Sequence, residues 1–283
     1  MTDTVPEIGA TPEMWERLAK RSDNHKYGHG HVLVLSGGPG RGGAARMAAR
    51  GALRIGAGLV TLGVPPAAQQ ENAARLDAIM LRRVADAAAL TGLLEDERLN
   101  AVCIGPGLGL TDDHAALVAA VLAAGRATLL DADALTLLSR DPVLADMLHE
   151  GCVLTPHAGE FGRLFSAIAE NVPDRIDATR AAAAQAGCTV LLKGAVTAIA
   201  SADGTTAIHR AEGPRAAPWL ATAGAGDVLA GFVSGLLARG FDPLQAAETG
   251  AWLHVECARA FGPGLIAEDL PDMLPQVFRT LGL

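Results

Sequence analysis

The chain has 283 residues, a length that suits one large α/β domain or two small ones. It is 50% hydrophobic but only 4% aromatic, so a sizeable core must be built from Ala, Leu, Val and Ile. The net charge of −8 argues against a nucleic-acid backbone as partner, and four scattered cysteines without a CxxC pair argue against a disulfide framework or a zinc site. Residues 1–25 lack the apolar segment of a signal peptide, and no apolar run reaches membrane-spanning length, so we expect a cytoplasmic protein.

Short apolar runs alternate with longer, Ala-rich helical patterns along the chain. We predict strands over residues 31–35, 59–64, 101–104, 127–130, 152–154 and 188–192, followed by a hairpin of 196–200 and 205–209 around Asp203-Gly204. A helix is expected from 44 to about 55, and two helices, 227–239 and roughly 244–260, are expected to close the chain. This alternation predicts an α/β fold, with a mostly parallel central sheet covered by helices on both faces in a single domain.

Each predicted strand ends in a cluster of Gly, Pro, Asp, His or Lys residues. In open α/β sheets, ligands bind outside the carboxyl ends of the strands. The clusters should therefore converge on one edge of the sheet, and this edge is where we expect the functional site.

The segment 223–227, Ala-Gly-Ala-Gly-Asp, carries the strongest functional signal. Apolar residues behind it, from Val228 to Leu237, repeat with helical spacing, and Gly240 marks the end of the helix. A glycine-rich turn at a helix N-terminus presents free N–H groups and the positive end of the helix dipole to an anion such as phosphate. Asp227 would then be an acid/base group beside a nucleotide phosphate. The alternative is an Asp that only begins the helix.

Two further glycine-rich loops follow predicted strands. Ser36–Gly43 runs from a strand into a helix, as a phosphate loop does, but it has neither the GK[ST] of a Walker A motif nor a clean dinucleotide fingerprint. Gly105–Gly109, Gly-Pro-Gly-Leu-Gly, is compact, and its glycines would let a ligand approach the backbone closely. A flexible connection and a tight structural turn remain equally good explanations of these two loops.

Polar and charged residues follow the remaining strands. His157 lies in a loop after a strand, whereas His254 lies inside a helical pattern, which favours a ligand or catalytic role for His157. Glu160 could instead cap the next helix at its N-terminus. Lys193 stands at a strand end, from which it can reach a phosphate as a point charge.

Asp131 and Asp133 are candidates for magnesium, held through waters, or for stabilising neighbouring loops. The residues alone do not rank these two roles. The polar cluster of His25, Lys26 and Tyr27 before the first strand is a further candidate for contact with a ligand.

Together these segments resemble the ADP/ATP-dependent NAD(P)H-hydrate dehydratases of the ribokinase-like superfamily. The resemblance extends from about His25 to the C-terminus, which makes residues 1–24 an N-terminal extension of a domain over 25–283. It rests on Gly-Gly-Ala44 at a helix start, Gly-Pro-Gly-Leu-Gly109, Leu-Asp-Ala-Asp-Ala-Leu135, Thr-Pro-His-Ala-Gly-Glu160, Leu-Lys-Gly-Ala-Val-Thr197 and Gly-Ala-Gly-Asp-Val-Leu-Ala-Gly231. The last motif is shared across ribokinase-like kinases, whereas Thr-Pro-His-x-Gly-Glu followed by Lys-Gly-x-x-Thr is much more specific.

The resemblance implies a role for each matching position. The hydrated nicotinamide dinucleotide, NAD(P)HX, would be held by Ala44, Gly107, His157 and Asp227. The adenine nucleotide would be held by Lys193, Gly194, Ala195, Val196, Thr197 and Gly226, with an anion hole formed by Gly224, Ala225 and Gly226. The implied reaction, with Asp227 as catalytic residue, removes water from the S epimer of NAD(P)HX to restore NADH or NADPH. It proceeds at the expense of ADP or ATP, with Mg²⁺.

Two positions depart from the pattern of this family. Ala217-Pro218 stands where Asn-Pro is frequent, and Ala223 stands where glycine is common, which leaves the choice between ADP and ATP open. The resemblance also implies a homo-oligomer, often a tetramer, to which the apolar C-terminal helices could supply an interface. The segment before His25 is too short for the epimerase domain that many relatives carry, so we expect a separate epimerase.

Two other functions remain open at this stage. A small-molecule kinase of the same superfamily, acting on a vitamin precursor or a sugar, would keep Gly226-Asp227 and the sheet. It would need neither of the two more specific motifs. A non-catalytic nucleotide-sensing protein would bind ADP without turning over a hydrated cofactor.

Overall fold

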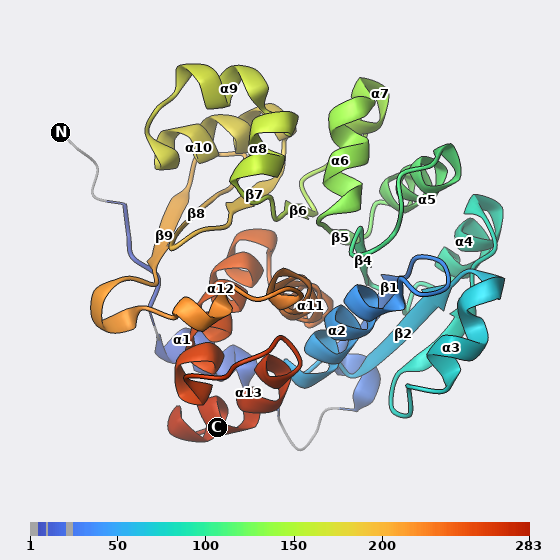
Figure 1. The fold of residues 1–283 in the computed structure, drawn as a ribbon, viewed down its shortest axis with the longest axis horizontal. Helices are drawn as coiled ribbons and strands as arrows, with labels where there is room; N and C mark the ends of the chain where they lie inside the picture. The colour runs from blue at the N-terminus through green and yellow to red at the C-terminus, as the bar shows by residue number, and fades with distance from the viewer. Residues whose placement is uncertain (1–4, 10, 21–24) are drawn as a thin grey trace.

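A nine-stranded sheet organises the computed structural model, which describes residues 5–9, 11–20 and 25–283 (Figure 1). The strands lie in the order β3-β2-β1-β4-β5-β6-β7-β8-β9. Their bounds are β1 His31–Leu35, β2 Leu59–Val64, β3 Met80–Arg83, β4 Ala101–Ile104, β5 Ala127–Leu130, β6 Cys152–Leu154, β7 Thr189–Leu192, β8 Val196–Ala200 and β9 Thr206–Arg210. The pairs from β3 across to β7 are all parallel, so the carboxyl ends of these strands meet at one edge.

The strands match the apolar runs of the sequence. β1, β4, β6 and β7 are buried along their whole length, as expected for parallel strands that are covered on both faces. β8 and β9 pair antiparallel, and Gly204 in the turn between them has a φ of 90°, which favours glycine. The predicted strands and the predicted hairpin are therefore confirmed.

Helices cover both faces of the sheet (Figure 1). α2, α11, α12 and α13 share one apolar core with it, and α4, α5, α6, α8 and α10 share the core on the opposite face. The helices are α1 Pro12–Leu18, α2 Gly42–Arg54, α3 Gln69–Ala73, α4 Ala87–Leu94, α5 Asp112–Ala123, α6 Asp133–Arg140, α7 Pro142–Ala145, α8 Ala158–Leu164, α9 Ser166–Asn171, α10 Arg175–Ala186, α11 Ala225–Ala238, α12 Pro243–Phe261 and α13 Asp269–Thr280. The predicted fold class is confirmed.

α11 is the central helix of its layer and packs closely against α2. A Cβ atom at Gly231 would lie 2.1 Å from the carbonyl oxygen of Ala48, and one at Gly235 would lie 2.3 Å from Cγ2 of Ile55. Glycine inside this helix weakens its intrinsic propensity, but here it lets two helix backbones approach each other. Every residue of α11 from Val228 to Ala238 is buried, so its apolar faces belong to the core of the chain itself.

Two elements differ from the prediction. The expectation that two helices close the chain is wrong, because α13 follows them. Its Pro275 breaks the helical pattern in the sequence, yet Leu270, Leu274 and Val277 form a buried face on the core. β3 was not predicted, because the residues of this edge strand are largely exposed and lack an apolar run.

The described part of the N-terminal segment lies against the same layer. Trp15 in α1 packs against Trp252 in α12 with ring centroids 5.3 Å apart, and Ile8 donates its N–H to Ile208 in β9 at 2.7 Å. All four cysteines are buried and free of disulfides, as expected from their spacing. In the part of the chain that the structure describes, no helix has the length and apolar character needed to cross a membrane.

Candidate functional site

The loops after β1 and β4 pack backbone against backbone at the carboxyl edge of the sheet. A Cβ atom at Gly37 would lie 1.9 Å from the carbonyl oxygen of Gly107, so no side chain fits there. Gly105 is equally confined, since its Cβ would lie 1.8 Å from the carbonyl oxygen of Asp131. The Cβ position of Gly107 lies 3.5 Å from Cβ of Ala44 in the first turn of α2. The structure thus brings Ala44 and Gly107 together, at the close approach of two loops.

The glycine-rich turn of the sequence leads directly into α11. Gly224 is the N-cap of the helix with a φ of 92°, and no side chain caps it. The amide of Ala225 makes a long contact of 3.4 Å to the carbonyl oxygen of Thr222. The amides of Gly226 and Asp227 have no hydrogen-bond partner among the described residues. The amide of Gly224 also has no partner among these residues, so this helix N-terminus offers three free donors to an anion.

The turn before α11 is fixed from the core side. A Cβ atom at Gly224 would lie 2.6 Å from Cε of Met47 in α2 and 2.9 Å from Cβ of Ala267. His254 in α12 is buried and donates its Nε2–H to the carbonyl oxygen of Ala225 at 2.8 Å. Burial lowers the pKa of His254 to about 4, so the ring is neutral at pH 7 and serves as a structural donor. It is not a proton carrier.

Asp227 occupies the first turn of α11 in a half-buried position. Burial raises the pKa of its carboxyl group to about 6, the nearby charge of Asp131 adds to this effect, and Lys193 partly offsets it. A carboxyl group with this pKa is ionised at pH 7 and can still hold a proton well enough to act as a base in catalysis. Such a shift at the end of a helix, beside free amides, is a physical indication of a functional carboxylate.

Lys193 connects the sheet edge with the turn before α11. It follows β7 and places Nζ 2.7 Å from Oδ1 of the buried Asp131 and 4.0 Å from Oε2 of Glu160. The same Nζ lies 3.5 Å from the position that a Cβ of Gly226 would occupy. A cation is therefore held beside the free amides of α11, where two carboxylates fix its direction.

Arg175, at the start of α10, supports this region and was not identified from the sequence. Its Nη2 donates to the carbonyl oxygens of Leu192 at 2.9 Å and Lys193 at 2.6 Å, and a Cβ at Gly194 would lie 2.7 Å from it. Thr197 donates its Oγ1–H to the carbonyl oxygen of Gly194 at 3.0 Å. The predicted nucleotide-binding residues 193–197 thus form the turn between β7 and β8 and the first two residues of β8, and Arg175 and Thr197 hold this turn in place.

His157 and Glu160 form a capping box at the start of α8. Nδ1 of His157 accepts the amides of Gly159 and Glu160 at 2.9 and 3.3 Å, while Oε2 of Glu160 accepts the amide of His157 at 2.8 Å. The capping role considered for Glu160 is therefore present. The side chain of His157 is 56% exposed, and because Nδ1 accepts two amides, its Nε2 carries the proton and lies 3.5 Å from Oε1 of Glu160.

The loop after β5 is strained. Ala132 has a φ of 50°, the one non-glycine residue in the described chain with positive φ, and such backbone conformations are often held at functional sites. Asp133 accepts the amide of Gly109 at 2.8 Å, which joins this loop to the one after β4. Among the described residues, no group of three or more His, Cys, Asp or Glu side chains could hold a metal ion. Asp131 and Asp133 thus each stabilise a neighbour within the site.

The cluster of His25, Lys26 and Tyr27 does not join the site. A Cβ at Gly58, just before β2, would lie 1.7 Å from the carbonyl oxygen of Lys26, which puts the cluster at the amino ends of the strands. The guanidinium group of Arg98, before β4, lies 5.4 Å from the ring centroid of Tyr27. These three residues, suggested from the sequence as a ligand contact, therefore lie at the opposite edge of the sheet from the candidate site.

Comparison with known proteins identifies the family. Residues 32–276 match the family model described as NAD(P)H-hydrate dehydratase. The chain belongs to this family. It is 38% identical to the ADP-dependent (S)-NAD(P)H-hydrate dehydratase of Neisseria meningitidis over 269 residues, which are 89% of this chain and 86% of the relative. The chain spans about half the length of other curated relatives that it matches, the bifunctional NAD(P)H-hydrate repair enzymes.

Solved structures agree with this assignment to the NAD(P)H-hydrate dehydratase family. The ADP/ATP-dependent NAD(P)H-hydrate dehydratase from Bacillus subtilis, co-crystallised with ATP and Mg²⁺, is 29% identical, with a TM-score of 0.80 and 99% of both chains covered. A ribokinase-like superfamily protein from Enterococcus faecalis is 26% identical, with a TM-score of 0.81 over 96% of this chain and 95% of that one. The ribokinase-like fold expected from the motifs is confirmed.

Proposed function

We propose that this protein removes water from the S epimer of hydrated NADH or NADPH and restores the reduced cofactor, at the expense of ADP or ATP. One observation carries the proposal: a carboxyl group with its pKa raised to about 6, Asp227, stands in the same helical turn as the unpartnered amide of Gly226. Family membership and the cation of Lys193 beside this turn support it. NAD(P)HX would contact Ala44, Gly107 and His157 as well as Asp227.

The chemistry follows from the poor leaving ability of hydroxide. Asp227 accepts the proton of the ring hydroxyl, and the hydroxyl oxygen forms a bond to the terminal phosphorus of the nucleotide as the bond to its bridging oxygen breaks. The amides of Gly224, Ala225 and Gly226, the anion hole expected from the sequence, stabilise the negative charge on the transferring group together with the amide of Asp227. The lone pair of the ring nitrogen then expels phosphate as the C–O bond breaks, and loss of a proton from the adjacent ring carbon to water forms the C=C bond and neutralises the ring. The products are AMP or ADP, phosphate and the reduced nicotinamide.

The adenine nucleotide would lie along residues 193–197, the turn after β7 and the start of β8, with its phosphates between Lys193 and the start of α11. Magnesium needs few protein ligands when it is bound mainly through phosphate oxygens and waters, and Asp131 and Asp133 would orient such waters. Their contacts to Lys193 and to the amide of Gly109 leave each with a second oxygen for this purpose. Magnesium would supply neutralisation of phosphate charge.

The test uses hydrated NADPH made from a single preparation and labelled with ¹⁸O in the ring hydroxyl. We expect recovery of the absorbance of reduced nicotinamide only with ADP or ATP, and the label in the released phosphate. Recovery with the label in water would contradict the phosphorylation step. No recovery with either nucleotide, together with a stable phosphorylated product from a vitamin precursor or sugar, would replace the proposal by a small-molecule kinase.

The oligomeric state and the supply of substrate belong to the same proposal. We expect a homo-tetramer, which sedimentation velocity would detect, and a separate epimerase that converts the R epimer. A mixture of epimers should then be repaired only to the extent of its S fraction, and full repair by this chain alone would contradict the separate epimerase.

A further inference from the structure

A large groove opens directly beside the candidate site. It has a volume of about 1040 Å³ and lies between α2, the segment 75–79 before β3, and α13. This is at the upper end of the size of small-molecule sites, about 300–1,000 Å³. Gly43 and Met47 of α2 line it. Gly43 precedes Ala44, and Cε of Met47 lies 2.6 Å from the position that a Cβ of Gly224 would occupy, so two lining residues of the groove border the candidate site.

One wall of the groove is a row of arginines. Arg46, Arg50 and Arg54 repeat every four residues along α2, and Arg75 faces them from the segment after α3. Four residues of helix advance about 6 Å, so the three arginines of α2 form a stripe roughly 12 Å long that leads away from the site. A stripe of guanidinium groups of this length is suited to a chain of phosphates.

The arginines of this groove are not equally paired with carboxylates. The carboxylate of Asp272 in α13 accepts hydrogen bonds from Nη2 of Arg50 at 2.5 Å and from Nη2 of Arg54 at 3.0 Å, so one carboxylate pairs with two guanidinium groups. Arg75 has no carboxylate within 4.0 Å among the described residues. Asp77 and Glu268 also line the groove, which favours the α2 wall and Arg75 as the place for an anion.

Arg46 is committed to a different contact. It donates to Glu71 and to Asn72, and Glu71 also accepts the amide of Gly40 in the loop over the site. These bonds lower the pKa of Glu71, which therefore stays ionised. Arg46 thus ties the groove to the loop after β1, while Arg50, Arg54 and Arg75 are left to face the groove.

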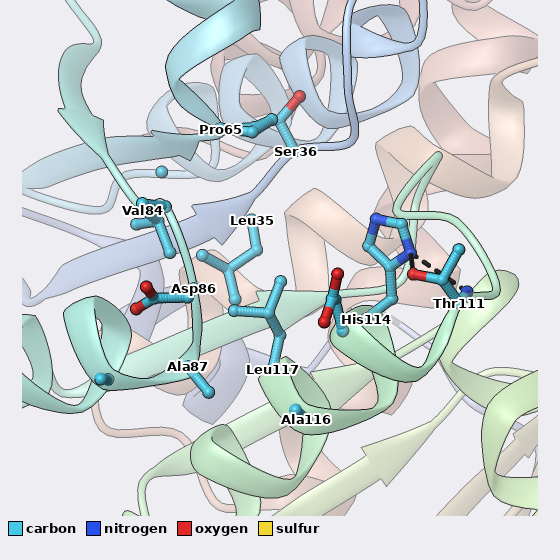
Figure 2. Close-up of a pocket in the computed structure, with 14 residues that line it drawn as sticks. Leu35, Ser36, Pro65, Val84, Asp86, Ala87, Thr111, His114, Ala116 and Leu117 are labelled. Carbon is cyan, nitrogen blue, oxygen red and sulfur yellow. Dashed lines mark hydrogen bonds between the residues drawn. The ribbon is translucent and has the colours of Figure 1, made fainter.

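A second hollow near the same edge lacks this character (Figure 2). It has a volume of about 460 Å³ between α4 and α5, with Leu35 and Leu117 in its lining. Its acidic lining residues are Asp86 and Asp113, whose carboxylates would repel a phosphate. Of these two hollows beside the site, the groove is therefore the one suited to a polyanion.

We infer that the groove holds the arm of the dinucleotide beyond its hydrated ring, with the pyrophosphate, and the 2′-phosphate where present, on Arg50, Arg54 and Arg75. This inference rests on the proposed function, since it extends the substrate from Asp227 past Ala44 and Met47 into the groove. It assigns substrate affinity to arginines that take no part in the chemical step, so their loss raises KM for the dinucleotide and leaves kcat and the KM for ADP unchanged.

The test is Arg75→Gln, with Arg279→Gln as matched control, because both arginines are exposed and Arg279 lies outside the groove lining. We expect Arg75→Gln to raise KM for the hydrated dinucleotide roughly tenfold, the size of one charge-assisted hydrogen bond, with kcat within twofold of wild type. Asp272→Asn, which releases Arg50 and Arg54, is expected to lower the same KM. Ala88→Trp, which fills the second hollow, is expected to leave it unchanged.

An equilibrium titration with NADPH, followed by nicotinamide fluorescence, separates this inference from the proposed function. Weaker NADPH binding by Arg75→Gln supports the groove even if wild-type protein restores no hydrate, in which case only the proposed reaction fails. If wild-type protein is active and Arg75→Gln binds NADPH as tightly as wild type, the inference about the groove is wrong and the proposed reaction stands. A rise in the KM for ADP instead, or an effect of Ala88→Trp but not of Arg75→Gln, also overturns it.

Discussion

After β1 and β4, the candidate site is made of backbone, whereas after β5 and β7 it is made of charged side chains. Gly37 and Gly107 meet with no room for a methyl group. Across the edge, Lys193 and the buried Asp131 are paired at 2.7 Å beside Asp227. The first half is fixed by shape and the second by charge balance.

The two halves are vulnerable to opposite kinds of substitution. A backbone wall fails when atoms are added, because close-packed loops must move to accept them. A charged cluster fails when one member is removed, because its neighbours are left unpaired and their pKa values shift. Substitutions chosen by these two rules should separate substrate fit from proton and phosphate chemistry.

The largest effect is expected from Asp227→Asn, which removes the base of the charged half while keeping its shape. Turnover of the hydrated dinucleotide should fall roughly 10²–10⁴-fold, the usual range for a lost acid/base group. Affinity for ADP, measured by calorimetry, should change little. A variant with near wild-type turnover would remove Asp227 from the mechanism and leave it as a residue that begins α11.

The same substitution should stabilise the protein above pH 6. The folded-state pKa of about 6 lies above the ordinary 3.8, so the folded state binds this proton more tightly, and wild-type stability falls as pH rises through that window. Neutral Asn avoids this loss, so the free energy of unfolding of the variant should exceed that of wild type by roughly 1–2 kcal/mol at pH 7.5. Thermal melts at pH 4 and pH 7.5 check the sign, since the gain of Asp227→Asn should be larger at the higher pH.

Lys193→Met is the next largest perturbation of the charged half. It removes the cation beside Gly226, so KM for the nucleotide should rise roughly 10–100-fold. Lys193 also holds the pKa of Asp227 down, so the fall of kcat/KM at low pH, centred near 6 in wild type, should move to higher pH. Lys26→Met, at the opposite edge, is the control. If the fall of kcat/KM at low pH does not move in Lys193→Met, the charge of Lys193 does not influence the pKa of Asp227.

The backbone half is tested by Gly37→Ala against Gly38→Ala. A methyl group at Gly37 would meet the carbonyl oxygen of Gly107, whereas one at Gly38 meets nothing within 4 Å. Gly37→Ala should destabilise the fold by about 1–3 kcal/mol and raise KM for the dinucleotide roughly tenfold, with Gly38→Ala near wild type. Equal behaviour of the two variants in melts and kinetics would show that this loop does not depend on close packing.

The sequence predicted the charged half less completely than the backbone half. Strand ends and glycine clusters located both, since apolar runs and glycine punctuation are local signals. The pairing of Lys193 with Asp131 joins residues 62 positions apart, and the support of Lys193 by Arg175 depends on how α10 returns to the sheet. Neither is encoded in a local pattern. The positive φ of Ala132 was equally invisible, because alanine gives no sign of it.

Ala223→Gly, the substitution toward the family pattern, should have the smallest effect and bears on the boundary between the two halves. Ala223 is exposed, and its φ is not among the positive values, so alanine adopts this conformation without strain. Gly224, the next residue, is the one that requires glycine, with Met47 at 2.6 Å from its Cβ position. We therefore expect KM for ADP and ATP within twofold of wild type and a stability lower by about 0.5–1 kcal/mol, because glycine has more freedom in the unfolded chain. A switch in the preferred nucleotide would instead mean that the methyl of Ala223 reaches the phosphates, so that at this one position shape, and not charge, selects the nucleotide.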